Sequence, residues 1–187
     1  MWFLYNIDEF TDNDYNKCLG LMEPTRKAKL LSGKHTLTRD MSIFGEWVTK
    51  TELSKITGID IENIKLARTE KGKPYAVDIP YFFNISHCEN LLAIAIDKKS
   101  IGIDIEKIKP LKSDVTKALC TQSDIDFLNS ADDDKMRLVN FYKIWTAKEA
   151  YFKMLGSGIT NLKSINYCDL NPKHYLENDC IVTIITE

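Results

Sequence analysis

The chain has 187 residues, of which 44% are hydrophobic and 28% are charged, and its formal net charge is -2. This composition is typical of a globular protein, and the charge gives no overall attraction to nucleic acid or to a membrane surface. The five cysteines are odd in number and widely spaced, which disfavours a disulfide framework and a zinc knuckle. No apolar run approaches the roughly 20 residues of a membrane span, and the acidic N-terminal region is not a signal peptide, so we expect a cytoplasmic protein.

The first third of the chain predicts one strand followed by helices. Residues 2–7 (WFLYNI) predict a short strand, and residues 12–57 are mainly helical in pattern. Within the helical region Pro24 can start one helix, and Gly33 can separate that helix from the next.

Two polar segments interrupt the strands that follow. Residues 64–76 (IKLARTEKGKPYA) predict a strand that runs into a turn at 72–74. The segment FNISH at 83–87 predicts a loop between apolar stretches, with Ser86 and His87 at the edge of a strand. A histidine in such a loop is more often structural than functional, so its position alone assigns it no role.

The next two segments predict a β-hairpin. Residues 91–97 (LLAIAID) form a nearly continuous apolar strand, and a tight polar connection leads to a second strand at 100–110 (SIGIDIEKIKP). In the second strand three isoleucines alternate with Gly102, Asp104 and Glu106, which predicts one buried face and one face with two neighbouring carboxylates. Because Gly102 has no side chain, we expect room for a ligand beside these acids.

After Pro110 the pattern predicts helices and two closing strands. Acids at positions 132–134 suit the N-terminus of a long helix that ends at about Leu155, before Gly156. The other expected elements are helix starts at Ser113-Asp114 and Ser123-Asp124 and strands at 164–170 (SINYCDL) and 180–187 (CIVTIITE).

Three carboxylates are candidates for a metal site. Asp104 and Glu106 share a strand face, and Glu149 lies on the long helix, where Trp145 is expected in the core. Oxygen ligands without histidine or cysteine favour Mg²⁺, which binds few carboxylates together with substrate phosphates, over zinc. Two alternatives stay open: the strand acids form a solvated face, and Glu149 and Lys153 form a surface pair.

A magnesium site calls for a phosphate substrate and therefore for cationic groups elsewhere in the chain. Arg26 and Lys29 are three residues apart on a predicted helix and project to one side, while the turn and the loop contribute Lys73, Ser86 and His87. Taken alone, the helix pattern is more typical of a solvated face. No GxxxxGKS loop is present, so the sequence does not support ATP hydrolysis.

Four sequence blocks carry a family resemblance: GKP at 72–74, FNISH at 83–87, GIDIE at 102–106 and WTAKEAYFK at 145–153. In this order they resemble the motifs of 4′-phosphopantetheinyl transferases of the larger, surfactin-synthetase-activating (Sfp) type. The resemblance implies an α+β fold in which two similar halves, residues 1–100 and 101–187, meet about a pseudo-twofold axis with the active site between them. It also implies a monomer, because the two halves supply the contact that the smaller family type obtains by trimerising.

The resemblance also implies a reaction. The 4′-phosphopantetheine arm of coenzyme A is transferred to a serine of an acyl, polyketide or peptidyl carrier protein, and adenosine 3′,5′-bisphosphate is released. Asp104, Glu106 and Glu149 would then hold Mg²⁺ against the coenzyme A pyrophosphate. Glu149 would also accept the serine proton, and Lys153 would reach the pyrophosphate, so the implied catalytic residues are Asp104, Glu149 and Lys153. Lys148 points about a quarter turn away and is less expected to contribute.

The coenzyme A contacts implied by the resemblance are Arg26, Lys29 and His87 for the 3′-phosphate, Ser86 beside it, Lys73 at the nucleotide end and Lys153 at the pyrophosphate. Two features depart from the family pattern. Met41 stands where the family usually has an arginine, so either Arg39, two residues earlier, replaces that contact or the contact is absent. The chain also ends before a further strand of the family pattern, so we expect a reduced sheet in the second half.

Two other functions stay open at this point: a module that binds coenzyme A or a carrier protein without turnover, and a Mg²⁺-dependent phosphoesterase. Retention of the three acids and of Lys153 favours the transferase, whereas the missing arginine and the short C-terminus favour the binding module. For a transferase we expect the carrier protein to dock on the segment from Lys112 to Asn129. We expect no nucleic-acid partner and no membrane partner.

Overall fold

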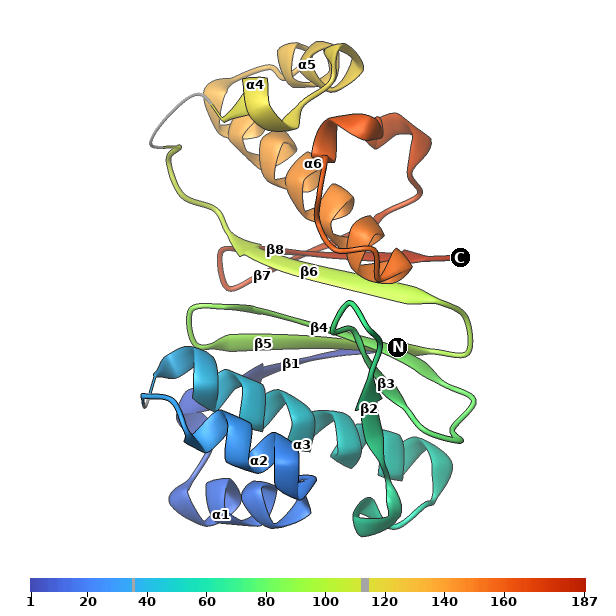
Figure 1. Cartoon of the computed structure of the whole chain (residues 1–187). Helices are drawn as coiled ribbons and strands as arrows, with labels where there is room; N and C mark the ends of the chain where they lie inside the picture. The colour runs from blue at the N-terminus through green and yellow to red at the C-terminus, as the bar shows by residue number, and fades with distance from the viewer. Residues whose placement is uncertain (35, 112–114) are drawn as a thin grey trace.

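The computed structural model describes residues 1–34, 36–111 and 115–187, and it confirms the predicted α+β class. Helices α1, α2 and α3 lie on the outer side of one sheet, and α4, α5 and α6 lie on the outer side of another (Figure 1). The elements of the first half are β1 (Trp2–Asn6), α1 (Asp12–Leu21), α2 (Pro24–Leu31), α3 (Leu37–Thr57), β2 (Leu66–Arg68), β3 (Pro74–Ala76), β4 (Phe82–Cys88) and β5 (Leu91–Asp97). Those of the second half are β6 (Ile101–Lys107), α4 (Thr116–Leu119), α5 (Gln122–Asn129), α6 (Asp134–Leu155), β7 (Lys173–Glu177) and β8 (Cys180–Thr186).

The two main sheets repeat one strand order. The first is the antiparallel sheet β1-β5-β4, and the second is the antiparallel sheet β6-β8-β7. Both have three strands. The expectation of a reduced sheet in the second half is therefore wrong for this main sheet. Within the described residues the second half lacks only a counterpart of the β2–β3 hairpin.

Each sheet packs one long helix on its outer face. In the first half, Phe44 and Leu53 of α3 pack against Ile94 of β5. In the second half, Ile144 of α6 packs with Ile181 of β8. These apolar contacts fix α3 and α6 on opposite sides of the paired sheets (Figure 1).

The inner faces of the two sheets pack against each other. The three isoleucines of β6 are at most 2% exposed and meet Ala93 and Ala95 of β5 in one cluster, so the predicted buried face of this strand is confirmed. Polar side chains of β4 also satisfy backbone groups of β6. Asn84 Oδ1 accepts a hydrogen bond from Ile103 N at 3.0 Å, and Ser86 Oγ accepts one from Ile105 N at 3.4 Å. The two halves are therefore held together by apolar packing and by hydrogen bonds.

The predicted pairing of β5 with β6 is wrong. β6 pairs with β8, with Asp104 opposite Thr183, while β5 lies between β1 and β4. The connection between β5 and β6 is short, but the chain changes sheet there instead of turning back within one sheet. Pairing between strands far apart in the chain outweighs the local hairpin signal.

Other elements differ locally from the prediction. Ser86 and His87 lie within strand β4 and not in a loop. The segment 164–170 does not form a strand. It begins at the last residue of one 3-10 turn, Leu162–Ser164, and contains another, Tyr167–Asp169, while the edge strand β7 was not predicted. Helix α5 begins at Gln122 because Thr121 caps it, and α6 runs from Asp134 to Leu155 as expected. The predicted helix start at Ser113-Asp114 lies outside the described residues.

Gly102 has a different role from the one expected. A Cβ atom at this position would lie 1.9 Å from the carbonyl oxygen of Ala150 and 2.7 Å from the backbone nitrogen of Met154. The space beside Gly102 is therefore filled by the backbone of α6 and leaves no room for a ligand. The glycine instead allows the helix that carries Glu149 to touch the strand that carries Asp104.

Candidate active site

Asp104 lies at the junction of the two halves and is 1% exposed. Its Oδ1 atom accepts hydrogen bonds from Lys153 Nζ at 2.5 Å and from Ser86 Oγ at 2.8 Å. Lys153 Nζ also lies 2.9 Å from Ser86 Oγ, so the three side chains form a closed triangle. The second oxygen, Oδ2, is buried without a hydrogen-bond partner. A buried carboxylate oxygen without a partner is costly, and it is available to a cation.

Glu149 lies one helical turn before Lys153 on the same side of α6. Its Oε1 atom accepts a hydrogen bond from Trp145 Nε1 at 2.7 Å, and its Oε2 atom lies 3.9 Å from Lys153 Nζ. Burial, followed by the negative charge of Asp104, raises the pKa of the Glu149 carboxyl. Trp145 was predicted only as a core residue, but its indole N–H also orients Glu149.

Glu106 completes the group of carboxylates. It lies two residues after Asp104 on the same face of β6. Burial raises its pKa to about 7, and the charges of Asp104 and then of Glu149 add to that effect. The negative charges that raise the pKa values of Glu106 and Glu149 come from neighbouring carboxylates, and a cation among these groups would offset that repulsion.

The donor chemistry at this junction fits a hard divalent cation. The observation that supports the fit is the orphaned Oδ2 atom of Asp104, together with the mutual repulsion of Asp104, Glu106 and Glu149. Within the described ranges, no three His, Cys, Asp or Glu side chains form a preassembled metal-binding group. The carboxylates therefore supply suitable ligands that are not yet gathered around one point.

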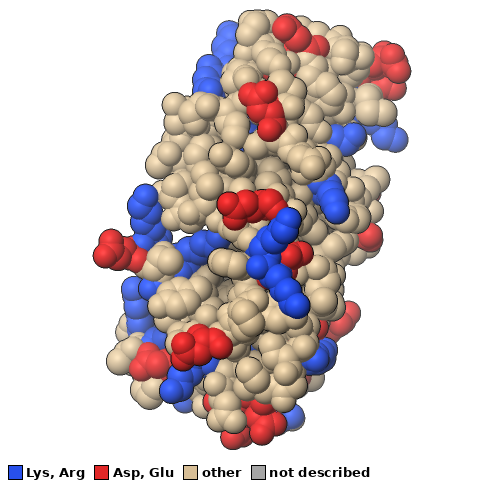
Figure 2. Space-filling view, turned by 90° about the vertical axis from the view of Figure 1, so that its right-hand side faces the viewer, with Lys and Arg blue, Asp and Glu red and all other residues tan. Residues whose placement is uncertain are grey.

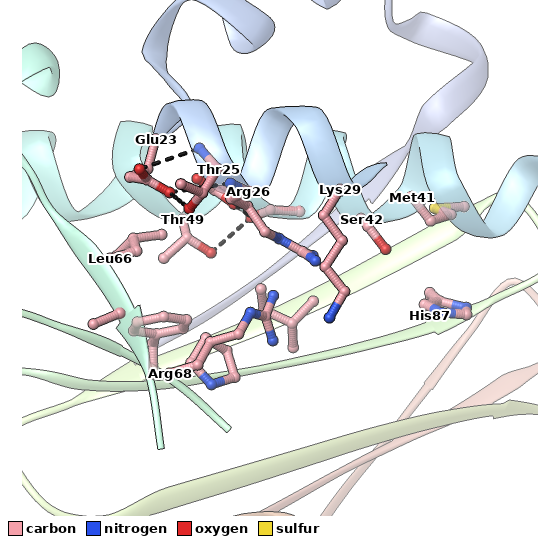
Figure 3. Close-up of a pocket in the computed structure, with 16 residues that line it drawn as sticks. Glu23, Thr25, Arg26, Lys29, Met41, Ser42, Thr49, Leu66, Arg68 and His87 are labelled. Carbon is pink, nitrogen blue, oxygen red and sulfur yellow. Dashed lines mark hydrogen bonds and ion pairs between the residues drawn. The ribbon is translucent and has the colours of Figure 1, made fainter. Parts of the chain in front are cut away.

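A pocket of about 600 Å³ opens on the first half of the chain, between α2, α3, β2 and β4. The side chains of Arg26, Lys29 and Arg68 extend toward one another in this pocket, and His87 of β4 lies at its edge (Figure 3). Burial, followed by the positive charge of Lys153, lowers the pKa of His87. Converging cations in a concave site are suited to a phosphate group.

Local sequence signals set the direction of the two helix cations. Pro24 occupies the first turn of α2, and the Glu23 carboxylate caps the helix by accepting hydrogen bonds from Thr25 N and Arg26 N. The helix therefore begins at a defined residue, and Arg26 and Lys29 share one face because they are three residues apart. The predicted grouping of these two cations on the pocket side is observed.

The pocket also contains residues that sequence reasoning missed. Arg68 lies at the end of β2 and lines the pocket, and its basic character just before the 72–74 turn was the available signal. Glu46 lines the pocket too, with its Oε2 atom 3.9 Å from Arg26 Nε. Burial raises the pKa of this carboxyl, while Lys50 and Arg26 act in the opposite direction. The cationic pocket therefore has a carboxylate in its own wall.

Two basic residues singled out in the sequence lie elsewhere. Lys73 does not line the pocket, and its Nζ atom donates to the carbonyl oxygen of Met154 at 2.6 Å. Arg39 contacts Tyr15 Oη at 3.2 Å and is not a lining residue, whereas Met41 contributes an apolar wall in the same region. Arg39 therefore does not line this pocket, whereas Arg68 contributes a cation to it from another element.

Lys148 is buried on the opposite side of α6. Its Nζ atom lies 2.5 Å from Asp124 Oδ2 and 3.0 Å from the carbonyl oxygen of Leu119, and both charged side chains are 0% exposed. The residue therefore joins α6 to α5, and its contacts are with Asp124 and Leu119 instead of with the carboxylate group. This agrees with the low expectation placed on Lys148 from its helical position.

Comparison with known families explains this arrangement. Residues 11–99 match a family model described as 4′-phosphopantetheinyl transferase, N-terminal, and residues 100–181 match one described as the 4′-phosphopantetheinyl transferase superfamily. The chain belongs to this superfamily. The two matches meet in the connection between β5 and β6, and together they cover both the cationic pocket and the carboxylate group. The resemblance inferred from the motif order is confirmed.

Individual relatives agree with this assignment. The chain is 30% identical over 146 residues to a 4′-phosphopantetheinyl transferase of Bacillus subtilis, with 78% of this chain and 65% of the relative covered. It is 27% identical over 158 residues to 4′-phosphopantetheinyl transferase Sfp of Bacillus subtilis strain 168, with coverages of 84% and 70%. It is 32% identical over 118 residues to 4′-phosphopantetheinyl transferase gsp of Aneurinibacillus migulanus, with coverages of 63% and 49%. The matches thus span half to about two thirds of these relatives.

Charged side chains of both signs are mixed on one face of the molecular surface (Figure 2). Lys and Arg side chains are interspersed with Asp and Glu on the face shown in Figure 2, which carries no broad area of one sign. Among the described helices, none has the length and apolar character needed to cross a membrane.

Proposed function

We propose that this superfamily member transfers the 4′-phosphopantetheine arm of coenzyme A to a serine of a carrier protein. The observation that carries the proposal is the state of Asp104, which has one oxygen bound by Lys153 and Ser86 and the other buried without a partner. This carboxylate faces Glu106 and Glu149 at the junction of the two halves. The cationic pocket lies on the first half, and His87 lines it one residue after Ser86 on β4.

The cationic pocket is the proposed site for the 3′-phosphate and nucleotide of coenzyme A. Arg26, Lys29 and Arg68 supply positive charge, and His87 supplies a further contact at the edge nearest Ser86. Binding there would place the pyrophosphate toward Lys153. The cations would hold the substrate equally in the ground state and the transition state, which lowers KM more than it raises kcat.

Asp104, Glu106 and Glu149 are the proposed ligands of Mg²⁺, and the orphaned oxygen of Asp104 supports this assignment. When bound, the cation would supply Lewis-acid stabilisation of negative charge on the pyrophosphate oxygens. Lys153 would hold the pyrophosphate from the other side, because its ammonium group is already fixed at this junction by Asp104 and Ser86.

In the proposed reaction the serine hydroxyl oxygen attacks the phosphorus atom that carries the pantetheine arm. The bond from that phosphorus to the bridging oxygen breaks, and adenosine 3′,5′-bisphosphate leaves. Glu149 would accept the serine proton, and the indole N–H of Trp145, which donates to Oε1, fixes the orientation of this carboxylate. Asp104 keeps Lys153 in place during the transfer.

The acceptor would be a serine on an acyl, polyketide or peptidyl carrier protein. The segment expected to dock it, residues 112–129, includes α4 and α5, and its first three residues lie outside the described residues. Both halves of one chain contribute to the site, so the enzyme would act as a monomer, and its use of coenzyme A would place it in the cytoplasm.

A mass-shift assay tests the proposal. The protein is incubated with coenzyme A, Mg²⁺ and each of several apo-carrier proteins, with and without EDTA, and the carrier mass is measured. A phosphopantetheine mass added to the carrier only without EDTA is the expected result. An unchanged carrier with intact coenzyme A would indicate a binding module, and cleavage of coenzyme A without a carrier would indicate a phosphoesterase.

A further inference from the structure

Lys73 reaches across the boundary between the two halves. It lies in the turn between β2 and β3, yet its Nζ atom donates to the carbonyl oxygen of Met154, 81 residues away, at 2.6 Å. Met154 is in the last turn of α6, where carbonyl groups have no partner within the helix. An ammonium group at this end of a helix satisfies such a carbonyl and complements the negative end of the helix dipole.

The stem of Lys73 is also closely fitted to the end of α6. Gly156 caps the helix with a φ of 66°, a left-handed conformation that favours glycine. A Cβ atom on Gly156 would lie 2.9 Å from Lys73 Cδ, which is closer than real Cβ contacts. The lysine therefore packs directly on the backbone of the helix terminus, and half-burial lowers its pKa.

The turn held by Lys73 carries a residue of the active site. Lys153 immediately precedes Met154, and its ammonium group lies 2.5 Å from Asp104 Oδ1. We propose that Lys73 is a positioning residue that fixes the last turn of α6, and through it Lys153, and that it does not bind the nucleotide. The absence of Lys73 from the lining of the cationic pocket supports this assignment. Its kinetic consequence rests on the proposed transferase function, whereas its structural consequence does not.

The kinetic test uses Lys73→Met, which keeps the length of the stem and removes the ammonium group. We expect kcat to fall about tenfold while KM for coenzyme A changes by less than about twofold, because the last turn of α6, which carries Lys153, is held less firmly but the cationic pocket is intact. Lys73→Arg should recover most of the lost kcat, since it restores a donor at the same place. The matched control is Lys71→Met, an exposed lysine in the same turn, which should leave both constants unchanged.

A second measurement separates this inference from the proposed function. Amide hydrogen exchange at Met154–Ser157 should become at least about fivefold faster in Lys73→Met than in the parent or in Lys71→Met, because the helix end loses its tether. Faster exchange in a protein without transferase activity would support the tether and reject the proposed function. Unchanged exchange would overturn the tether.

Nucleotide binding decides between the two roles of Lys73. Calorimetric titration with adenosine 3′,5′-bisphosphate should give the same Kd for Lys73→Met and for the parent protein. A Kd raised by about tenfold or more, with kcat retained, would show a direct nucleotide contact and overturn the proposal.

A double-mutant cycle tests the packing at Gly156. Gly156→Ala adds a methyl group against the Lys73 stem, whereas the same change in a Lys73→Ala background meets no stem. We expect the denaturant midpoint to fall less on Gly156→Ala in the Lys73→Ala background than in the parent chain. Equal shifts in both backgrounds would show that the two residues do not interact and would remove the packing argument.

Discussion

Asp104 Oδ1 and Lys153 Nζ are 2.5 Å apart across the contact between β6 and α6. We predict that Lys153→Met lowers the free energy of unfolding by about 1–3 kcal/mol without added Mg²⁺, because the Asp104 carboxylate stays buried and loses its cation. The same change should lower kcat about 100-fold or more if Lys153 holds the pyrophosphate. Urea titration and steady-state kinetics check the two effects.

Lys135→Met is the control for Lys153→Met, since Lys135 is an exposed lysine near the start of the same helix. It should change neither unfolding nor turnover. A Lys153→Met protein as stable as the parent would show that the ion pair with Asp104 contributes little.

Added Mg²⁺ should stabilise the parent protein, because a cation relieves the repulsion among the three carboxylates. A ligand at about 100 times its Kd contributes about 2.7 kcal/mol to the free energy of unfolding, and EDTA should remove that gain. The measurement is the melting temperature with Mg²⁺ or EDTA. Asp104→Asn should abolish the difference, so an equal response in this variant would place the cation elsewhere.

Lys29→Ala should raise KM for coenzyme A about tenfold and leave kcat within about twofold, because a phosphate contact changes little between ground state and transition state. Initial-rate kinetics over a range of coenzyme A concentrations give both constants. Lys27→Ala is the matched control, since Lys27 lies on the same helix but does not line the pocket. A drop confined to kcat would contradict the assignment of Lys29 to substrate binding.

Lys148→Met should lower the free energy of unfolding by about 3–5 kcal/mol, because it leaves Asp124 as a buried charge without its partner. Both side chains are 0% exposed, so solvent cannot replace the lost contact. Urea denaturation measures the change. The double variant Lys148→Met with Asp124→Asn should be more stable than Lys148→Met alone, and the reverse order would contradict the buried ion pair.

His174 should make the protein less stable in mild acid. Its ring contacts Tyr167 Oη at 3.0 Å and Thr183 Oγ1 at 2.8 Å, and burial lowers its pKa from 6.5 to about 4. As the pH falls from 6.5 toward 4, the unfolded chain binds a proton that the folded protein does not, so stability decreases in this window.

The His174→Gln variant isolates this effect. Thermal unfolding at pH 7 and pH 5 should show a smaller loss of stability for the variant than for the parent. Parallel losses in the two proteins would show that His174 does not titrate on unfolding.

The sequence predicted those features that depend on local patterns. The alternation in β6, the extent of α6 and the sides on which Arg26 and Lys29 project follow from side-chain periodicity, and the structure confirms them. The order of the motifs was sufficient to identify the family, because four blocks in a fixed order are more specific than any one block alone.

Features that depend on distant contacts could not be predicted in the same way. The partner of β6 is β8, which follows it by more than 70 residues, and no local pattern identifies that pairing. Arg68 and Glu46 enter the pocket because β2 and α3 form its walls together with α2, and neither residue belongs to one of the four sequence blocks. The contact of Lys73 with Met154 likewise depends on how the two halves dock.

The contact at Gly102 sets how closely the strand that carries Asp104 approaches the helix that carries Glu149. Main-chain atoms of the helix meet the strand at this point, so the closest approach of the two elements is set by the backbone. Gly102 thus allows the closest approach of β6 to α6. Because a Cβ at this position would overlap backbone atoms of α6, any substitution would force the strand and the helix apart and so change the separation of Asp104 and Glu149.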